Sequence, residues 1–533
     1  MLDFDGSRLY PAMGDIPDAF RLKGYKDNAS YLIEGKILDC ANKSDVYSPI
    51  CCYADGTAHR YRLGSYPLLN EEEATKALQA AEKAYDSGMG EWPRMPVEER
   101  INHIEEFARQ LRKQEREFIR WEMWEIAKPH DSARDEFRRT IEYIADTVGQ
   151  LKKLDADSNL IKNTEGFIAQ IRRCPLGVSL IMGPYNYPLN ETMAMLLPAL
   201  IMGNTAVLKL PRYGCLCLEP LFSAFADSFP PGVINIINGD GPVIIPPILK
   251  PGSIAVLGFI GSTAVAKKVI AQHPYNNRMR NILGLEAKNP AFVFPDCDLE
   301  LTVKECINGA LEFNGQRCTA LKHIWVHEEI ADRFISELNR EIGKLKYGLP
   351  WDDGVKITPL AENQKCEQLT RWVQDALDKG ADIVNSGGGQ YAGNLFYPTV
   401  LYPVTSDMDI YNVEQFGPLI PVSSFSTWEQ IQFYMQESDF GQQASIFTGS
   451  AFNAAPLIDI LANQVSRINL NAQCRRGPDE LPFTGRKNSA EGTLSVHDAL
   501  RAFSIRALVV ANEQGRELFL RTIESNQSRF LRI

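Results

Sequence analysis

Residues 177–184 read GVSLIMGP, an apolar run that ends in a Gly-Pro turn. Three further runs of this kind follow: TAVLKLP at 205–211, GVINIING at 232–239 and SIAVLGFIGS at 253–262. Helices are predicted between them, over 189–201, 216–229 and 264–272. Short apolar strands that alternate with helices indicate parallel βαβ units in a sheet covered on both faces. The stretch therefore predicts a doubly wound α/β lobe.

A second α/β block follows the first. The runs PAFVF, KHIWVH, YPTVLYPV, LIPVSSF, ASIFTG and RINLN predict strands, with helices between most of them. Two β-like segments, 166–173 and 503–510, lie apart from both blocks, and we expect them to pair with each other or with another subunit. Ahead of the first lobe, apolar residues at helical spacing predict helices over 71–87 and 132–154, and one long helix from 97 to Pro129.

Composition restricts the classes of protein to consider. A chain of 533 residues exceeds one hydrophobic core, so two or three domains are expected. Lys and Arg total 56 and Asp and Glu total 67, a formal net charge of −11. This charge argues against a general nucleic-acid binder but leaves room for a local basic pocket. The longest apolar stretch, 193–202, is too short to span a membrane as a helix.

The cysteines and the N-terminus bear on the compartment. Eleven cysteines are scattered without a CxxC pair, which favours reduced thiols in an intracellular enzyme. No basic segment followed by an apolar block opens the chain, so a cytoplasmic protein is expected. His323 and His327 are four residues apart, but KHIWVH has the pattern of a strand and no acidic or cysteine ligands accompany it. We therefore expect no metal site.

Candidate chemistry rests on a helix start and a cysteine. No complete GxGxxG follows a predicted strand, and no GxSxG occurs. Ser262 and Thr263 open a predicted helix, where N–H groups and hydroxyls can hold a phosphate, although ordinary helix caps have the same residues. In FNGQRCTA, Cys318 follows Arg317, whose charge favours the thiolate. Cys318 is thus a candidate nucleophile, and the alternative is a buried structural cysteine.

Seven motifs resemble, in order and spacing, those of the NAD(P)-dependent aldehyde dehydrogenase superfamily: GPYNYP, LKLPR, FIGST, AKNPA, GQRCTA, EQFGP and PFTGRK. The resemblance implies two doubly wound α/β lobes with a small β oligomerisation element. It places the dinucleotide-binding domain at 1–160 and 174–283 and the catalytic domain at 284–495. The oligomerisation element and C-terminal tail would be 161–173 and 496–533. A homodimer or homotetramer is implied, and we expect no nucleic-acid or membrane partner.

The resemblance also implies the chemistry of the reaction. Cys318 matches the catalytic cysteine, which attacks the aldehyde to form a thiohemiacetal. Asn186 matches the asparagine whose amide forms the oxyanion hole together with the Cys318 backbone N–H. Hydride transfer to the nicotinamide then leaves a thioester. For the cofactor, the resemblance implies that Lys209 contacts the adenine ribose and that Ser262 contacts the pyrophosphate. Glu414 would contact the nicotinamide ribose, with Phe416 packed beside it.

Arg212 bears on the choice of cofactor. It stands in LKLPRYG, where NAD-preferring relatives often have glutamate. A carboxylate there binds a ribose 2′-hydroxyl and repels a 2′-phosphate, whereas a guanidinium can hold that phosphate with two hydrogen bonds. NADP is therefore expected, with NAD as the alternative. The other explanation of Arg212 is a solvated surface charge.

Within the superfamily, GQRCTALK, RGPDELPFTGRK and YGLPWDDGVKITPL resemble the non-phosphorylating glyceraldehyde-3-phosphate dehydrogenases. These enzymes oxidise D-glyceraldehyde 3-phosphate to 3-phosphoglycerate. The resemblance implies a substrate-phosphate site of clustered arginines and a tyrosine, at Arg139, Tyr187, Arg317 and Arg476. Each arginine alone is equally explained by a surface ion pair, so it is their joint presence that favours the phosphate.

The resemblance fails at one catalytic position. Relatives read Glu-Leu-Gly-Gly-Lys with the glutamate 34 residues before the cysteine, but position 284 is glycine here, in GLEAK. That glutamate activates the water that hydrolyses the thioester. Glu286 is the candidate replacement; otherwise another group or bulk water serves, or the acyl group passes to an acceptor such as coenzyme A or phosphate. The alternatives are therefore an acyl-transferring dehydrogenase and a catalytically impaired relative.

Overall fold

The computed structural model describes residues 9–12, 14–54 and 57–532. The four runs quoted first form adjacent parallel strands in an eight-stranded sheet of order β2-β1-β9-β8-β7-β10-β11-β23. Its strands are β1 (Ser30–Ile33), β2 (Lys36–Asp39), β7 (Val178–Met182), β8 (Thr205–Lys209), β9 (Ile234–Ile237), β10 (Ile254–Ile260), β11 (Arg280–Gly284) and β23 (Ala490–Glu491). The predicted doubly wound α/β lobe is confirmed.

Helices cover both faces of this sheet because its strands present apolar residues to each face in turn. Leu180 and Val207 face one core, beside α1 (Glu71–Tyr85), α9 (Pro246–Leu249) and α10 (Thr263–Ile270). Ile181 and Leu208 face the other core, beside α3 (Val97–Lys113), α5 (His130–Ser158), α6 (Asn190–Ile201) and α7 (Phe222–Ser228). All five residues of β7 are buried, as a strand between two helical layers must be.

The long helix predicted from 97 to Pro129 is wrong, because the structure has two helices there. α3 ends at Lys113, and α4 (Glu115–Ile126) begins after Gln114. Apolar residues keep helical spacing on both sides of Gln114, and no glycine or proline stands at the break. A periodic pattern therefore does not reveal this break, and both α3 and α4 pack along α5.

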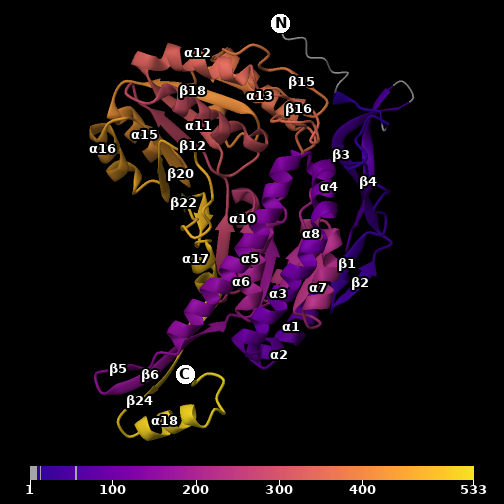
Figure 1. Cartoon of the computed structure of the whole chain (residues 1–533), viewed down its shortest axis with the longest axis vertical. Coiled ribbons are helices and arrows are strands. Elements are labelled where there is room, and N and C mark those ends of the chain that lie inside the picture. Colours follow the sequence, from indigo (N-terminus) through magenta and orange to yellow (C-terminus); the bar gives the residue numbers. More distant parts are fainter. Residues whose placement is uncertain (1–8, 13, 55–56, 533) are drawn as a thin grey trace.

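The second lobe is built on a seven-stranded sheet of order β14-β17-β18-β13-β12-β20-β21. Its strands are β12 (Asn289–Val293), β13 (Leu321–His327), β14 (Asp382–Ile383), β17 (Thr399–Tyr402), β18 (Leu419–Phe425), β20 (Gln443–Phe447) and β21 (Arg467–Leu470). Its main helices are α11 (Leu299–Leu311), α12 (Ala331–Ile342), α13 (Lys365–Asp378), α15 (Trp428–Glu437) and α16 (Ala451–Leu461). Figure 1 shows this lobe above the first one. Residues 285–288 link the two sheets, so GLEAK crosses from one lobe to the other.

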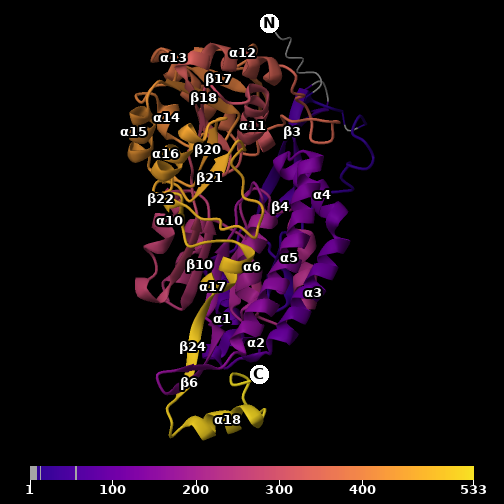
Figure 2. The same cartoon turned by 60° about the vertical axis from the view of Figure 1, so that its left-hand side comes forward.

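The two detached strands form an arm. β24 (Ser504–Ala511) pairs antiparallel with β6 (Phe167–Pro175), from Ser504 opposite Pro175 to Ala511 opposite Ile168. Of the two predicted alternatives, pairing with each other and pairing with another subunit, the structure shows the first. β5 (Lys162–Thr164) completes the sheet, and α18 (Arg516–Glu524) lies beside it at the lower end of the molecule (Figures 1 and 2). Over the described ranges, no helix is long and apolar enough to cross a membrane.

Candidate active site

A cavity of about 1130 Å³ lies between the two lobes. The first lobe supplies the loops that follow strands β7, β8, β10 and β11, so the cavity lies at the carboxyl ends of the parallel strands, where open α/β sheets bind ligands. The second lobe supplies the loop before β13 and residues near Glu414. Of the twelve residues predicted from the sequence, eleven line this cavity: Arg139, Asn186, Tyr187, Arg212, Ser262, Glu286, Arg317, Cys318, Glu414, Phe416 and Arg476.

Cys318 sits in the strained loop that precedes β13. Phe313 and Asn314, a few residues earlier, both have left-handed backbone angles, with φ of 48° and 57°. The Asn314 side chain stabilises this turn, since it donates to the Thr358 carbonyl at 3.0 Å and accepts the Thr358 N–H at 2.9 Å. Burial raises the pKa of the Cys318 thiol, and the charge of Glu414 raises it further. The thiol form is therefore favoured before an aldehyde enters.

Asn186 lies against the cysteine loop. Its Nδ2 donates to the Gln316 carbonyl at 2.7 Å, two residues before Cys318. The structure thus brings together the predicted nucleophile and the predicted oxyanion donor, which come from different lobes. An amide nitrogen has two hydrogens, so one donor position of Asn186 remains for an oxyanion while the other bonds Gln316.

Lys128, which the sequence analysis overlooked, holds the backbone of Asn186 in place by a hydrogen bond. Its ammonium is fully buried, donates to the Asn186 carbonyl at 2.9 Å and pairs with Glu122 at 3.0 Å and with Glu136. Although burial disfavours the cation, the two carboxylates raise the pKa of Lys128 above its ordinary value. Glu136 also accepts the N–H groups of residues 189 and 190 at the start of α6. The sequence feature that could have revealed Lys128 is its position directly before the helix-breaking proline in WEIAKP.

The arginines predicted to hold the substrate phosphate all have carboxylate partners. Arg139 forms two bonds with Asp479, at 2.8 and 2.6 Å. Arg476 pairs with Glu191 and lies 3.4 Å from Asp479. Arg317 pairs with Glu312 at 2.9 Å. The sequence analysis missed these carboxylates, although Asp479 is part of the RRGPD motif.

Two of these arginines still have unused donors. Nη2 of Arg476 and Nε of Arg317 are buried and have no hydrogen-bond partner. Buried donors without partners are rare in native proteins, and such a donor can bond an oxygen of a bound ligand or of water. The Tyr187 ring lies against Lys128, with the ammonium 3.7 Å from the ring centroid, and burial raises the Tyr187 pKa to about 12.

Glu286 faces the start of α10. Its Oε2 accepts the Thr263 N–H at 2.9 Å, and among the described residues it forms no hydrogen bond with Cys318. The carboxylate predicted to replace the missing base thus occupies the helix terminus at which Ser262 was predicted to bind pyrophosphate. Gly284, at the position of the usual base, ends β11 beside Ile260 of β10.

A second carboxylate, Glu414, acts on the pKa of the Cys318 thiol. The Glu414 side chain is 8% exposed, accepts the Ala287 N–H at 3.3 Å and lies 3.4 Å from the Lys322 ammonium. Burial raises the pKa of Glu414, and Lys322 opposes this rise. The Lys322 ammonium also lies 4.9 Å from the ring centroid of Phe416. Glu414, Lys322 and Phe416 form one packed group beside Cys318, and the sequence analysis missed Lys322.

The donors at the first-lobe side of the cavity are suited to a phosphorylated cofactor. Ser262 caps α10, and its hydroxyl accepts the Val265 N–H at 3.4 Å. Arg212 is exposed at the cavity mouth, and no carboxylate within the described residues forms an ion pair with it. Lys209 ends β8 and does not line the cavity; burial lowers its pKa. A hydroxyl, a helix terminus and a free guanidinium are donors that bind phosphate.

Comparison with known proteins identifies the class. The sequence profile of the Aldehyde dehydrogenase family matches residues 55–508. The chain is 32% identical over 460 residues to the NADP-dependent glyceraldehyde-3-phosphate dehydrogenase of Streptococcus equinus. The aligned region covers 85% of this chain and 93% of that relative. The chain therefore belongs to the aldehyde dehydrogenase family, and the predicted family is confirmed. It is an NAD(P)-dependent enzyme that oxidises an aldehyde.

Solved structures support the same fold. The NADP-dependent glyceraldehyde-3-phosphate dehydrogenase of Bacillus halodurans C-125, complexed with NADP, has a TM-score of 0.83 at 30% identity and covers 91% of this chain and 100% of its own. The NAD-dependent aldehyde dehydrogenase of Sinorhizobium meliloti has a TM-score of 0.85 at 26% identity and covers 95% and 98%. One of these relatives is described with NADP and the other with NAD, so the family alone does not choose the cofactor.

Proposed function

We propose that this enzyme oxidises D-glyceraldehyde 3-phosphate to 3-phosphoglycerate with NADP. The observation that carries the proposal is that Arg139, Tyr187, Arg317 and Arg476 line the same cavity as Cys318. A phosphate dianion needs clustered donors, whereas an uncharged aldehyde does not. The unpartnered donors of Arg317 and Arg476 support the proposal, because they supply bonds that the ion pairs leave unused.

In the proposed reaction, the Cys318 sulfur attacks the aldehyde carbon and the thiol proton departs. The carbonyl oxygen becomes an oxyanion, which accepts hydrogen bonds from the Asn186 amide and the Cys318 N–H. A hydride then leaves the carbon, and the thiohemiacetal on Cys318 becomes a thioester. Water adds to the thioester, the carbon–sulfur bond breaks, and 3-phosphoglycerate leaves while Cys318 regains its proton.

NADP, when bound, accepts the hydride. We assign its pyrophosphate to Ser262 and its 2′-phosphate to Arg212, with Lys209 at the adenine ribose. Glu414 and Phe416 are assigned to the nicotinamide end, where the charge of Lys322 opposes the rise in the Glu414 pKa that burial causes. Replacing Arg212 with alanine tests the phosphate assignment. It should raise KM for NADP about tenfold and leave KM for NAD unchanged, because only NADP carries the 2′-phosphate; equal changes would contradict the assignment.

The water step is assigned to Glu286. Its carboxylate is a base within the same cavity, and its present bond to the Thr263 N–H is one that a cofactor phosphate can take over. Release from Thr263 would free the carboxylate to activate water. Because Gly284 stands at the family's usual base position, the second candidate function is acyl transfer to coenzyme A or phosphate. A catalytically impaired relative is the third.

One assay separates these functions. NADPH formation from glyceraldehyde 3-phosphate is followed in buffer alone, then with coenzyme A or phosphate added. Sustained turnover in buffer alone is expected. A single burst that continues only with an acceptor supports acyl transfer, and no burst at all supports an impaired relative. Arg476→Leu should raise KM for the phosphorylated aldehyde much more than for glyceraldehyde, and equal effects would exclude the phosphate site.

A further inference from the structure

A second cavity, of about 710 Å³, lies between α3, α5, β6 and the C-terminal segment that follows α18. We call it the tail pocket. Six arginines line it, whereas Asp155 is the one carboxylate among its lining residues. These arginines are Arg94, Arg100, Arg172, Arg173, Arg529 and Arg532. A local excess of positive charge in a chain of net charge −11 calls for a physical explanation.

The nearby carboxylates match only part of this charge. Asp155 pairs with Arg172 at 3.1 Å and with Arg532 at 3.0 Å. Glu98, at the rim, pairs with Arg532 at 3.4 Å. Within the residues that the structure describes, the other four arginines of the tail pocket form no ion pair. Their recorded bonds go to neutral oxygens, such as the Ser504 hydroxyl for Arg173 and the Gly90 carbonyl for Arg94.

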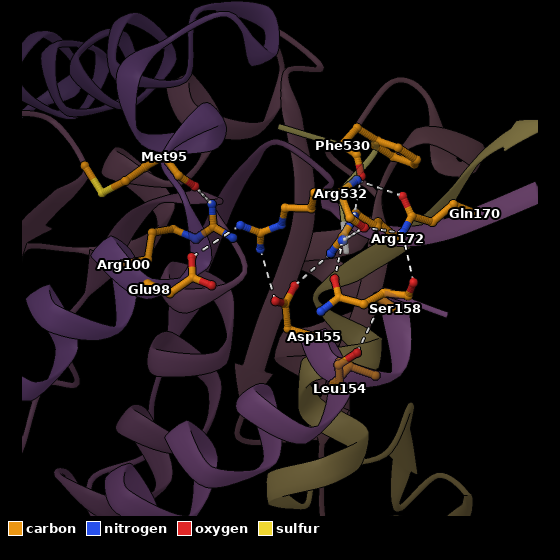
Figure 3. A network of polar contacts seen from close by, with 11 residues as sticks. Met95, Glu98, Arg100, Leu154, Asp155, Ser158, Gln170, Arg172, Phe530 and Arg532 are labelled. Atoms are coloured by element: carbon orange, nitrogen blue, oxygen red, sulfur yellow. Dashed lines mark hydrogen bonds and ion pairs between the residues drawn. The ribbon is translucent and has the colours of Figure 1, made fainter. Parts of the chain in front are cut away.

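Arg100 is the least balanced of these groups. It is only 5% exposed, and its guanidinium donates to the carbonyls of Ile201, at 2.8 Å, and Met95. Burial lowers its pKa to about 10 although the charge of Asp155 opposes this. Figure 3 shows the Arg100 and Arg532 side chains reaching toward one another, so a second cation faces it. A buried cation without a counter-ion is costly, and a bound anion removes that cost.

The C-terminal segment adds to the excess. Arg172 donates to the carbonyls of Phe530 and Arg532, and Gln170 exchanges two hydrogen bonds with the backbone of Arg532 (Figure 3). These bonds use the backbone of the segment, and the Arg532 side chain pairs separately with Asp155 and Glu98. The segment thereby brings Arg529 and Arg532 to a wall that is already positive. Like charges repel, so this arrangement gains stability when an anion lies between them.

We propose that the tail pocket binds a small phosphorylated anion, held between the body of the first lobe and the C-terminal segment. Guanidinium groups match phosphate oxygens with paired hydrogen bonds, which makes phosphate the anion favoured by an arginine cluster. The volume falls within the ~300–1,000 Å³ of small-molecule sites, so the ligand can carry an organic part as well as phosphate. The pocket is separate from the Cys318 cavity, and the proposal is independent of the substrate assigned above.

The test is isothermal titration of the full-length enzyme with inorganic pyrophosphate and, separately, with ADP, each in excess NADP. NADP occupies phosphate subsites near Ser262 and so removes them from the measurement. Saturable binding of at least one probe is expected, and it should weaken as salt is added. The probe that binds more tightly distinguishes an inorganic from a nucleotide source. The absence of saturable binding by both probes would overturn the proposal.

Variants locate the binding. Arg529→Ala should weaken it about threefold and Arg529→Ala with Arg532→Ala at least tenfold, whereas Arg521→Ala is the control. Arg521 lies on α18, is exposed and pairs with Glu517, so it shares the charge and the neighbourhood but not the pocket. Arg529 is exposed and donates to the Arg94 carbonyl, so its loss leaves the fold intact. Equal affinity in the wild type and the double variant would refute the site.

Discussion

The two arginine-lined cavities of this enzyme differ in how their charge is matched. Around Cys318, Arg139, Arg317 and Arg476 each face a carboxylate of their own chain. In the tail pocket, only Arg172 and Arg532 of the six arginines pair with a carboxylate, Asp155 or Glu98. A guanidinium held by an internal carboxylate is oriented before the ligand arrives, and the ligand must compete for it. A guanidinium without such a partner is less well oriented but binds an anion without displacement.

The largest expected effect comes from a variant that should stop the reaction in the Cys318 cavity and leave the tail pocket unaffected. Cys318→Ser should lower kcat about a thousandfold or more, because a hydroxyl is a far weaker nucleophile than a thiolate. Binding of anions in the tail pocket should remain unchanged in this variant. Formation of NADPH is the measurement for the first statement and titration with pyrophosphate for the second. Retained turnover would place the reaction elsewhere than at Cys318.

The next largest effect is the loss of stability when a buried carboxylate loses its cation. Lys128→Met leaves Glu122 and Glu136 buried without their cation, and breaking a buried ion pair in this way costs about 3–5 kcal/mol of the free energy of unfolding. Denaturant unfolding measures this loss. Lys152→Met is the matched control, since Lys152 and Glu105 form an exposed pair that is worth less than about 1 kcal/mol. A similar small change in both variants would contradict the interpretation of Lys128.

The sequence was sufficient for the fold because its strands are short and apolar and end in turns. GVSLIMGP and its three companions can be accommodated only between two helical layers, and this places the cavity at their carboxyl ends. The break at Gln114 was not predictable, since no residue there opposes a helix. Helical periodicity reports which side of a segment is buried and does not report where a helix is interrupted.

The site was predictable in its residue types but not in its pairings. The motifs located Cys318 and Asn186, yet nothing local in the sequence links Arg476 to Glu191 or Lys128 to Asn186, since these partners come from separate elements. Glu286 illustrates the same limit. Its position in the sequence, two residues after Gly284, made Glu286 a candidate base. Its hydrogen bond to Thr263 depends instead on how β11 and α10 are placed in space.

Ionisation of the Cys318 thiol tests how matched charges act in the first cavity, because the thiol has both a carboxylate and an ammonium as neighbours. Burial and Glu414 raise the thiol pKa, whereas Lys322 lowers it. The rate of alkylation of Cys318 by iodoacetamide should therefore rise about tenfold per pH unit up to a pKa above the ordinary value of ~8.5. Glu414→Gln should move this rise to lower pH, since it removes a negative charge beside the thiolate. The rate is followed by mass spectrometry of the Cys318 peptide, and an unmoved profile would show that Glu414 does not act on the thiol.

The smallest effect tests whether an internal carboxylate competes with the substrate. Glu191→Gln keeps the size of the side chain but removes the charge that pairs with the buried Arg476. Because Arg476 would then keep Asp479 as its one charged partner, KM for glyceraldehyde 3-phosphate should fall about threefold to tenfold, the equivalent of ~1 kcal/mol. KM for glyceraldehyde, which has no phosphate, should stay the same.

Glu105→Gln is the control for Glu191→Gln, since Glu105 is exposed, pairs with Lys152 and lies outside the cavity lining. It should change neither KM. If Glu191→Gln raises KM for the phosphorylated aldehyde, then Glu191 positions Arg476 for the phosphate instead of competing with it. The matched charges around Cys318 would then serve to orient the arginines, and the tail pocket, in which only Arg172 and Arg532 have carboxylate partners, would be the weaker and less selective anion site of the two.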